Sequence, residues 1–414
     1  MIEFDRFRLD NGLRVFVHRD ETTPLAVLNL MYDVGSRDEH PERTGFAHLF
    51  EHLMFSGSKN VPSPDRPLQK VGGESNAFTS TDLTNYYMTL PAENLETAFW
   101  LESDRMLSLA FSPEGLEVQR KVVVEEFKQR YLNRPYGDTW LKMRPLAYQK
   151  HPYRWATIGK EVRHIEEASM EEVKDFFFRF YRPNNAILVV AGNVTSDQVR
   201  QLSQKWFGPI PAGDVPERKL PEEPAQTAAR QTEAFGDVSL EQLTLAFPMV
   251  AHQHPDYVAT DLLSDVLGGD SSSILYRKLV TEREIFQTID AYITGSIDPG
   301  LFMISGRVRE TVSLEAAHEA LLETLREVQT TPLPKPYLEK VKNQAEATIT
   351  FSEVNLLNRA LQIAYGALLG NPNLVNEQQK QIRGVHLTQV TRLAREVLAP
   401  KRSNTLFYRR QNKA

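Results

Sequence analysis

The sequence GFAHLFEHLMF, residues 45–55, contains the most specific chemical pattern of the chain, because His48, Glu51 and His52 form His-x-x-Glu-His inside an apolar run. No glycine or proline interrupts residues 46–55, so a helix is predicted there. Positions three and four apart share one helix face, which brings both imidazoles and the carboxylate together. Two imidazoles from adjacent turns supply half of a zinc site, and a neighbouring carboxylate can take a proton from water. A core helix with two hydrogen-bonded histidines is the alternative, and the zinc site is the favoured interpretation.

The composition bounds the class of protein. The 414 residues are 41% hydrophobic and 25% charged, as expected for a globular protein of more than one domain. A net charge of −6 argues against nucleic acid or an anionic membrane as the main partner. The absence of cysteine leaves His, Asp and Glu as metal ligands. No apolar run reaches about 18 residues, and residues 1–6 do not resemble a secretory signal. We therefore expect a cytoplasmic protein without membrane contact, or a periplasmic one if a signal has been removed.

The order of predicted elements repeats along the chain. Alternating or apolar runs predict strands and amphipathic runs predict helices up to residue 207, and a proline-punctuated, acidic stretch then predicts an exposed linker. A similar series of strands and helices follows. The sequence therefore predicts an α+β fold of two homologous α/β-sandwich halves, each a mostly antiparallel sheet packed with helices. The expected ranges are a catalytic zinc domain at 1–212, a linker at 213–234 and a non-catalytic homologous domain at 235–414.

A third protein ligand is expected on the predicted helix 114–130. Its apolar side is centred on Leu116, Val123 and Phe127, and Glu126 falls between Val123 and Val122 at about 100° per residue. Glu125 points to the polar side. A carboxylate on an apolar face is costly unless it is paired or bound to metal, which favours Glu126 as the ligand. A buried ion pair to Arg120 or Arg130 is the alternative explanation.

These residues resemble the inverted zinc motif of the M16 (inverzincin) peptidases, a family that includes pitrilysin, insulin-degrading enzyme and the mitochondrial processing peptidase. The resemblance covers nearly the whole chain, and its matching residues are 72–73, 76–79, 86, 119–126, 181–186 and 192–194. It implies a fold similar to the LuxS/metallopeptidase type and the short, two-subunit branch of the family. It also implies that His48, His52 and Glu126 bind Zn²⁺ and that Glu51 is the general base for peptide hydrolysis.

The resemblance further implies a substrate-binding strand. Asn76, Ala77, Phe78 and Thr79 match the active-site edge-strand region of the family, where an extended peptide can add to a sheet. An ordinary turn followed by a strand is the alternative. The position seven before the third ligand, often a second acid in the family, is Gln119 here, which argues against a charged supporting role at that site.

The second half departs from the family pattern. Complete members of this branch carry an Arg and, seven residues later, a Tyr that help to bind the substrate backbone, and Val280 and Gln287 occupy those positions here. Neither side chain can replace a guanidinium fork or a phenol. We therefore expect the zinc-bearing subunit of a heterodimer whose homologous partner supplies the Arg and Tyr. A homodimer with altered specificity and a non-catalytic scaffold or peptide-binding subunit are the competing hypotheses.

Overall fold

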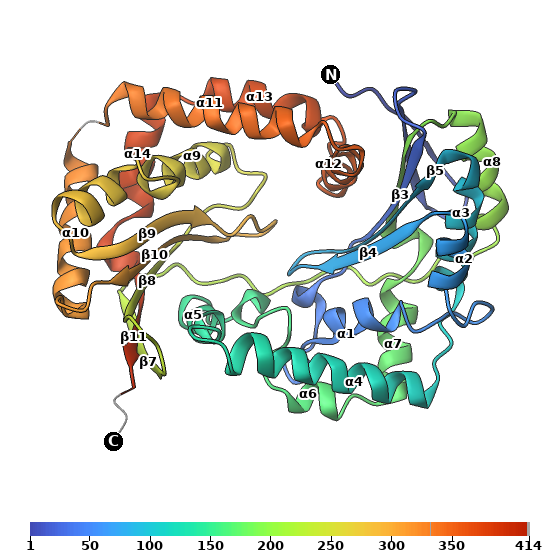
Figure 1. Ribbon diagram of the computed structural model, residues 1–414, viewed down its shortest axis with the longest axis horizontal. Helices are drawn as coiled ribbons and strands as arrows, with labels where there is room; N and C mark the ends of the chain where they lie inside the picture. Colours follow the sequence, from blue (N-terminus) through green and yellow to red (C-terminus); the bar gives the residue numbers. More distant parts are fainter. Residues whose placement is uncertain (332, 412–414) are drawn as a thin grey trace. The chain divides into compact units, whose positions relative to one another are not determined.

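The computed structural model describes residues 1–331 and 333–411, which form two compact units (Figure 1). Unit 1 comprises Met1–Phe127, Trp155–Leu220 and Thr350–Gln378, and unit 2 comprises Lys128–Arg154, Pro221–Ile349 and Gln379–Ala414. Both units therefore draw on chain segments from before and after the linker. The contiguous ranges 1–212, 213–234 and 235–414 divide the chain by its repeated element order, and as domain boundaries they stay a prediction.

Unit 1 contains a six-stranded mixed sheet in the order β1-β2-β6-β3-β5-β4. Only β2 and β6 pair in parallel, and the other neighbours are antiparallel. Its strands are β1 (Asp5–Arg8), β2 (Arg14–Arg19), β3 (Leu25–Tyr32), β4 (Glu74–Thr79), β5 (Thr84–Pro91) and β6 (Ala186–Gly192). Its helices are α1 (Phe46–Leu53), α2 (Asp65–Lys70), α3 (Leu95–Leu107), α4 (Pro113–Phe127), α6 (Arg163–Glu166), α7 (Met170–Phe180), α8 (Ser196–Trp206) and α12 (Leu356–Leu368).

Unit 2 contains a five-stranded sheet in the order β7-β11-β8-β10-β9. Its strands are β7 (Arg230–Gly236), β8 (Gln242–Pro248), β9 (Phe286–Ile293), β10 (Leu301–Val308) and β11 (Asn404–Arg410). Its helices are α5 (Thr139–Ala147), α9 (Tyr257–Gly268), the π-helix η6 (Tyr276–Glu282), α10 (Leu314–Thr330) and α14 (Leu387–Val397), together with most of α11 (Lys335–Ser352) and α13 (Leu374–Gly384).

The two sheets share one topology. In unit 2, β7 and β11 pair in parallel, and the pairs β11–β8, β8–β10 and β10–β9 are antiparallel. The same pattern runs through β2, β6, β3, β5 and β4 of unit 1. The predicted fold class is confirmed, and the matching strand order supports the internal duplication. Strand β7 begins at Arg230, inside the range expected for the linker.

Each sheet is covered on one face by a helix from the other half of the sequence. Helix α12 follows the linker by more than a hundred residues, yet Ala360, Ile363 and Ala364 pack against Val27 and Val189 of the unit 1 sheet. Helix α5 precedes the linker and packs against the unit 2 sheet. The residues of that second contact include Met143, Ala147, Ala234, Ala246, Met303 and Leu406. The two halves therefore exchange one helix each.

An ion pair joins α12 to the loop that follows β2 in unit 1. This ion pair leads to a prediction about stability in acid. Arg359 donates to the Asp20 carboxylate at 2.7 Å, and the two side chains are only 17% and 12% exposed. Hydrogen bonds from the Thr22 hydroxyl and N–H, together with Arg359, lower the pKa of Asp20 to about 2. Because this pKa lies below the value of about 3.9 in an unfolded chain, the pair stabilises the fold above pH 4 and loses its effect as the pH falls toward 2.

Replacing Asp20 by asparagine is therefore expected to lower the unfolding free energy by roughly 1–2 kcal/mol at neutral pH and to flatten its decline between about pH 4 and pH 2. Urea unfolding at a series of pH values measures both effects. Glu21→Gln is the matched control, because Glu21 is an exposed neighbour that pairs with Arg19. Equal pH profiles for the wild type and Asp20→Asn would contradict the assignment.

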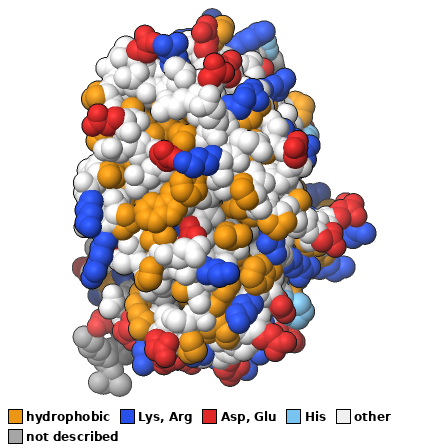
Figure 2. Space-filling model, turned by 90° about the vertical axis from the view of Figure 1, so that its right-hand side faces the viewer, with side chains coloured by type: hydrophobic (Ala, Val, Ile, Leu, Met, Phe, Trp, Pro, Cys, Tyr) orange, Lys and Arg blue, Asp and Glu red, His pale blue; other side chains and the backbone are white. Residues whose placement is uncertain are grey.

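The surface carries charges of both signs. On the face that lies at the right of Figure 1, both basic and acidic side chains are present, with groups of apolar side chains between them (Figure 2). In the described part of the chain, no helix is both long and apolar enough to cross a bilayer.

Candidate metal centre

Helix α1 begins at a position that only glycine can occupy. Gly45 has φ = 89°, and an added Cβ would lie 2.7 Å from the carbonyl oxygen of Ile158. The carboxylate of Glu39 accepts hydrogen bonds from the N–H groups of Gly45 and Ala47, both at 2.9 Å, and so satisfies the first turn. Burial raises the pKa of Glu39 to about 8, while these N–H donors act to lower it. The start of the motif helix is thus fixed by a residue six positions upstream.

The motif helix divides into a buried side and a chemical side. Its apolar members, among them Leu49, Phe50 and Leu53, are buried in the unit 1 core. The side chains of His48 and His52 remain 12% and 23% exposed, and their rings lie edge to face with centroids 4.8 Å apart. The helical period predicted from the sequence therefore brings both imidazoles to one accessible face.

Glu126 of α4 completes a group of three ligand side chains. One ligand atom from each of His48, His52 and Glu126 lies within 4.8 Å of the others. Glu126 Oε2 is 3.6 Å from His48 Nε2 and 3.3 Å from His52 Nε2. Ligands at about 2.1 Å from a tetrahedral zinc ion stand about 3.4 Å apart, so the spacing suits zinc. Two imidazoles and one carboxylate are also a donor set that zinc accepts. The residues present therefore fit the ion.

The face of α4 differs in part from the sequence prediction. Glu126 is half-buried and Glu125 is exposed, as expected. Val122 was expected on the apolar side, but it is 44% exposed, and Val124 is buried in its place. The packed face of α4 is therefore rotated toward Val124, and Glu126 stands at its margin. Arg120, one of the two predicted alternative partners of Glu126, donates to Glu117.

Glu51 lies beside strand β4. The hydroxyl of Thr79 donates to Glu51 Oε2 at 2.6 Å, which joins the motif helix to the strand. Strand β4 is the last strand of the sheet and pairs with β5, so no strand among the described residues pairs with its other backbone edge. Asn76 and Phe78 are exposed, whereas Ala77 and Thr79 are half-buried on the side of α1. The predicted edge strand and the predicted base thus lie together.

A buried ion pair of α3 contacts the end of the motif helix. Arg105 and Glu102 of α3 pair with each other, and Arg105 donates to the carbonyl oxygen of Met54 at 3.4 Å. The guanidinium lies 5.1 Å from the ring centre of Tyr86, whose hydroxyl pKa is raised by burial. Sequence reasoning missed this pair. The available signal was Glu102, which falls among the apolar positions 95, 99 and 106 of its helix.

The positions expected to hold Arg and Tyr in unit 2 are occupied by residues with other roles. Val280 of η6 is 8% exposed and belongs to the unit 2 core. Gln287 is exposed on β9, the last strand of its sheet. Among neighbouring cations, Arg283 pairs with Glu323 and Arg277 with Glu282. Among the described residues, the group of His48, His52 and Glu126 is the one cluster with metal-ligand spacing.

Comparison with known proteins assigns both halves of the chain. Residues 14–142 match the family model described as Insulinase (Peptidase family M16), and residues 167–345 match the Peptidase M16 inactive domain. The Zinc protease PqqE of Helicobacter pylori is 30% identical over 407 residues, which cover 96% of this chain and 91% of that protein. A probable mitochondrial-processing peptidase subunit beta of Arabidopsis thaliana is 25% identical over 71% of this chain and 57% of its own length.

The crystal structure of a protease from Helicobacter pylori superposes with a TM-score of 0.91 at 28% identity, covering 99% of this chain and 100% of that one. Two domain models from one family, a relative of 30% identity over nearly the whole length and a matching fold therefore agree, and the chain belongs to peptidase family M16.

Proposed function

We propose that this protein is a zinc-dependent endopeptidase that hydrolyses extended peptides or unfolded segments. The observation that carries the proposal is the approach of His48, His52 and Glu126 to zinc-ligand spacing, with Glu51 beside them at an open strand edge. Membership of a peptidase family and the zinc protease names of relatives support it. His48, His52 and Glu126 would hold Zn²⁺, which when bound supplies a Lewis acid that polarises water and the scissile carbonyl.

The chain's own residues account for the remaining chemistry. Glu51 takes the proton of the attacking water and passes it to the leaving amine. Thr79 binds one carboxylate oxygen of Glu51 and thereby orients the carboxylate toward the reacting atoms. The backbone of Asn76–Thr79 aligns the peptide by adding it as a strand to β4, so specificity rests on shape and extension more than on a single side chain.

Loss of the Thr79 hydroxyl is expected to slow the reaction without weakening substrate binding. We expect Thr79→Val to lower kcat about tenfold or more and to change KM less than about threefold, because the carboxylate loses the group that orients it. Thr79→Ser keeps the hydroxyl and should restore most of kcat. Steady-state kinetics with the zinc content of each variant test this. A fully active Thr79→Val variant would show that the hydroxyl does not position the base.

We further propose that the chain acts as the catalytic subunit of a heterodimer. Val280 and Gln287 stand where substrate-binding Arg and Tyr are expected, and a relative is named as the beta subunit of a processing peptidase. The homologous partner would supply these two side chains. The test measures zinc content and peptide hydrolysis of the purified chain, alone and together with a homologous M16 subunit that carries the Arg and Tyr.

Three outcomes separate the hypotheses. One bound zinc with hydrolysis only in the presence of the partner supports the heterodimer. Rapid hydrolysis by the chain alone would refute the role given to Val280 and Gln287 and favour a homodimer. Failure to bind zinc even after supplementation would remove the peptidase proposal and leave a scaffold or peptide-binding subunit.

A further inference from the structure

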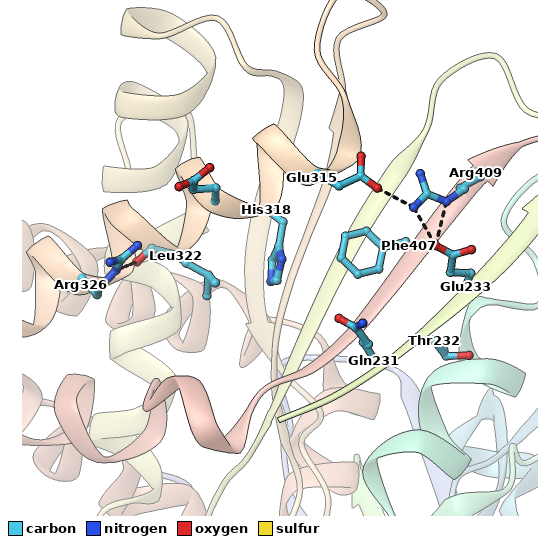
Figure 3. A pocket seen from close by; sticks show the side chains of 10 residues that line it. Gln231, Thr232, Glu233, Glu315, His318, Leu322, Arg326, Phe407 and Arg409 are labelled. Atoms are coloured by element: carbon cyan, nitrogen blue, oxygen red, sulfur yellow. Dashed lines mark hydrogen bonds and ion pairs between the residues drawn. The ribbon is translucent and has the colours of Figure 1, made fainter. Parts of the chain in front are cut away.

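Unit 2 has an open groove whose lining residues have no role assigned in the chemistry. It has a volume of about 650 Å³ and lies between α10 and the strands β7 and β11 (Figure 3). Glu315, His318 and Leu322 of α10 line one side, and Glu233, Phe407 and Arg409 of the strands line the other. All these residues belong to unit 2, so the groove is a property of this unit by itself.

The duplicated fold identifies what occupies the equivalent place in unit 1. Strands β2 and β6 correspond to β7 and β11, because each is the one parallel pair of its sheet. Helix α3 follows β5 as α10 follows β10. In unit 1 the chain continues from β6 into α8, and α8 packs against α3 and β2. In the described part of unit 2, no helix follows β11. The groove is therefore the counterpart of the α8 position.

Residue positions agree with this correspondence. Helix α3 begins Leu95-Glu96-Thr97-Ala98-Phe99, and α10 begins Leu314-Glu315-Ala316-Ala317-His318. The first residue (leucine) and the fourth residue (alanine) are buried in both helices. Glu96 accepts hydrogen bonds from Lys205 at 2.6 Å and from the indole of Trp206 at 3.1 Å. Phe99 packs on Phe207 with ring centres 6.0 Å apart. Glu96 and Phe99 thus hold the end of α8, and their counterparts Glu315 and His318 line the groove.

The groove offers the same combination of chemistry. His318 lies edge-on to Phe407 at 5.3 Å, and Leu322 adds an aliphatic surface (Figure 3). Burial lowers the pKa of His318, which favours the neutral ring. Glu315 contacts Arg409 at 2.7 Å, as does Glu233, and the rim also carries Glu319. An apolar floor with carboxylates at the rim suits an aromatic side chain followed or preceded by a basic one.

We propose that this groove binds an amphipathic helix of a different protein chain, which presents an aromatic residue to His318, Leu322 and Phe407 and a basic residue to Glu315. A second copy of this chain is a poor source, because its own α8 is already packed against α3 through Phe207, which is fully buried. The mode is helix-in-groove recognition, and it does not depend on the zinc site.

The probe for this groove is a fluorescein-labelled peptide of residues 194–210, which contains Lys205, Trp206 and Phe207. It is titrated with full-length Glu51→Gln protein, so that hydrolysis cannot remove the probe. We expect saturable binding by fluorescence anisotropy, weakened at least about tenfold by Leu322→Lys in the protein or by alanine at positions 206 and 207 of the peptide. Leu322 is half-buried, and a lysine can keep its stem in place with the charge at the rim.

Matched controls separate groove binding from other causes. Ala316→Lys places the same charge on an exposed position of α10 outside the groove and should bind the peptide as well as the parent. Unfolding midpoints and zinc content establish that Leu322→Lys is folded. Absence of saturable binding, or binding that Leu322→Lys leaves unchanged, would overturn the proposal. Self-association of the chain that Leu322→Lys abolishes in sedimentation would assign the groove to a second copy instead and would also overturn it.

Discussion

Replacing Glu51 by glutamine is expected to lower peptide hydrolysis by about 10²- to 10⁴-fold while the protein stays folded and keeps its zinc. Glutamine has nearly the same shape and can still accept the hydrogen bond from the Thr79 hydroxyl, so the strand and the helix remain joined. Its amide oxygen, however, has no useful basicity and cannot take a proton from water. The change therefore removes proton transfer and little else.

The measurement is kcat/KM of Glu51→Gln with the homologous subunit present, alongside zinc content and the thermal midpoint. Retained zinc with strongly reduced hydrolysis identifies Glu51 as the general base. An active Glu51→Gln enzyme would move the proton transfer to another group. A variant that also loses its zinc would show that Glu51 serves the metal site, and the division of roles within the motif would need revision.

The second large effect is expected from Glu126→Gln. Two imidazoles remain in that variant, but the charge that balances a divalent ion is gone, so zinc affinity should fall more than about 100-fold. A bound ion would also join α1 to α4 through these side chains, and binding to the folded state alone would raise stability by mass action. Wild-type protein should therefore lose thermal stability when a chelator removes the metal, whereas Glu126→Gln should melt at one temperature with or without the chelator.

The neighbouring Glu125 provides a matched control. Glu125→Gln makes the same chemical change one position away, on the exposed side of α4, and should keep stoichiometric zinc and the chelator response. Isothermal titration with zinc and thermal scans measure both variants. Equal zinc affinity in the two would remove Glu126 from the ligand set and return it to the role of a partly buried ion-pair residue.

The sequence predicted those features that depend on local periodicity. Helix α7 runs from Met170 to Phe180, because its apolar positions recur at helical spacing and Ser169 caps it. Strand β6 is apolar throughout, and β3 is apolar except for Asn29, since both faces of these strands are covered. Two members of the candidate metal centre, His48 and His52, follow from one helical repeat, and Glu126 follows from its place on a helix face.

The features that depend on distant pairing were not predicted. Strand β11 pairs in parallel with β7, which lies about 170 residues earlier in the sequence. Because β11 ends in charged residues, its local sequence does not clearly indicate a strand. Helix α5 contains Pro145, which argues against a helix in any local reading. Glu39 and the Thr79 hydroxyl reach the motif helix only after the chain has folded. The exposed Val122 shows the same limit, because a helix face is selected by what packs against it.

The reciprocal placement of α5 and α12 means that neither half of the polypeptide is self-sufficient. A fragment of residues 1–220 would carry the candidate metal centre but not α12, leaving Val27 and Val189 open to water, and we expect it to aggregate when expressed alone. Co-expression with residues 221–414 should restore soluble protein, and a soluble, monomeric 1–220 fragment would contradict this. A gene for this protein could therefore be divided between the two halves only if both polypeptides were produced together, because each half supplies a helix that the other needs to fold.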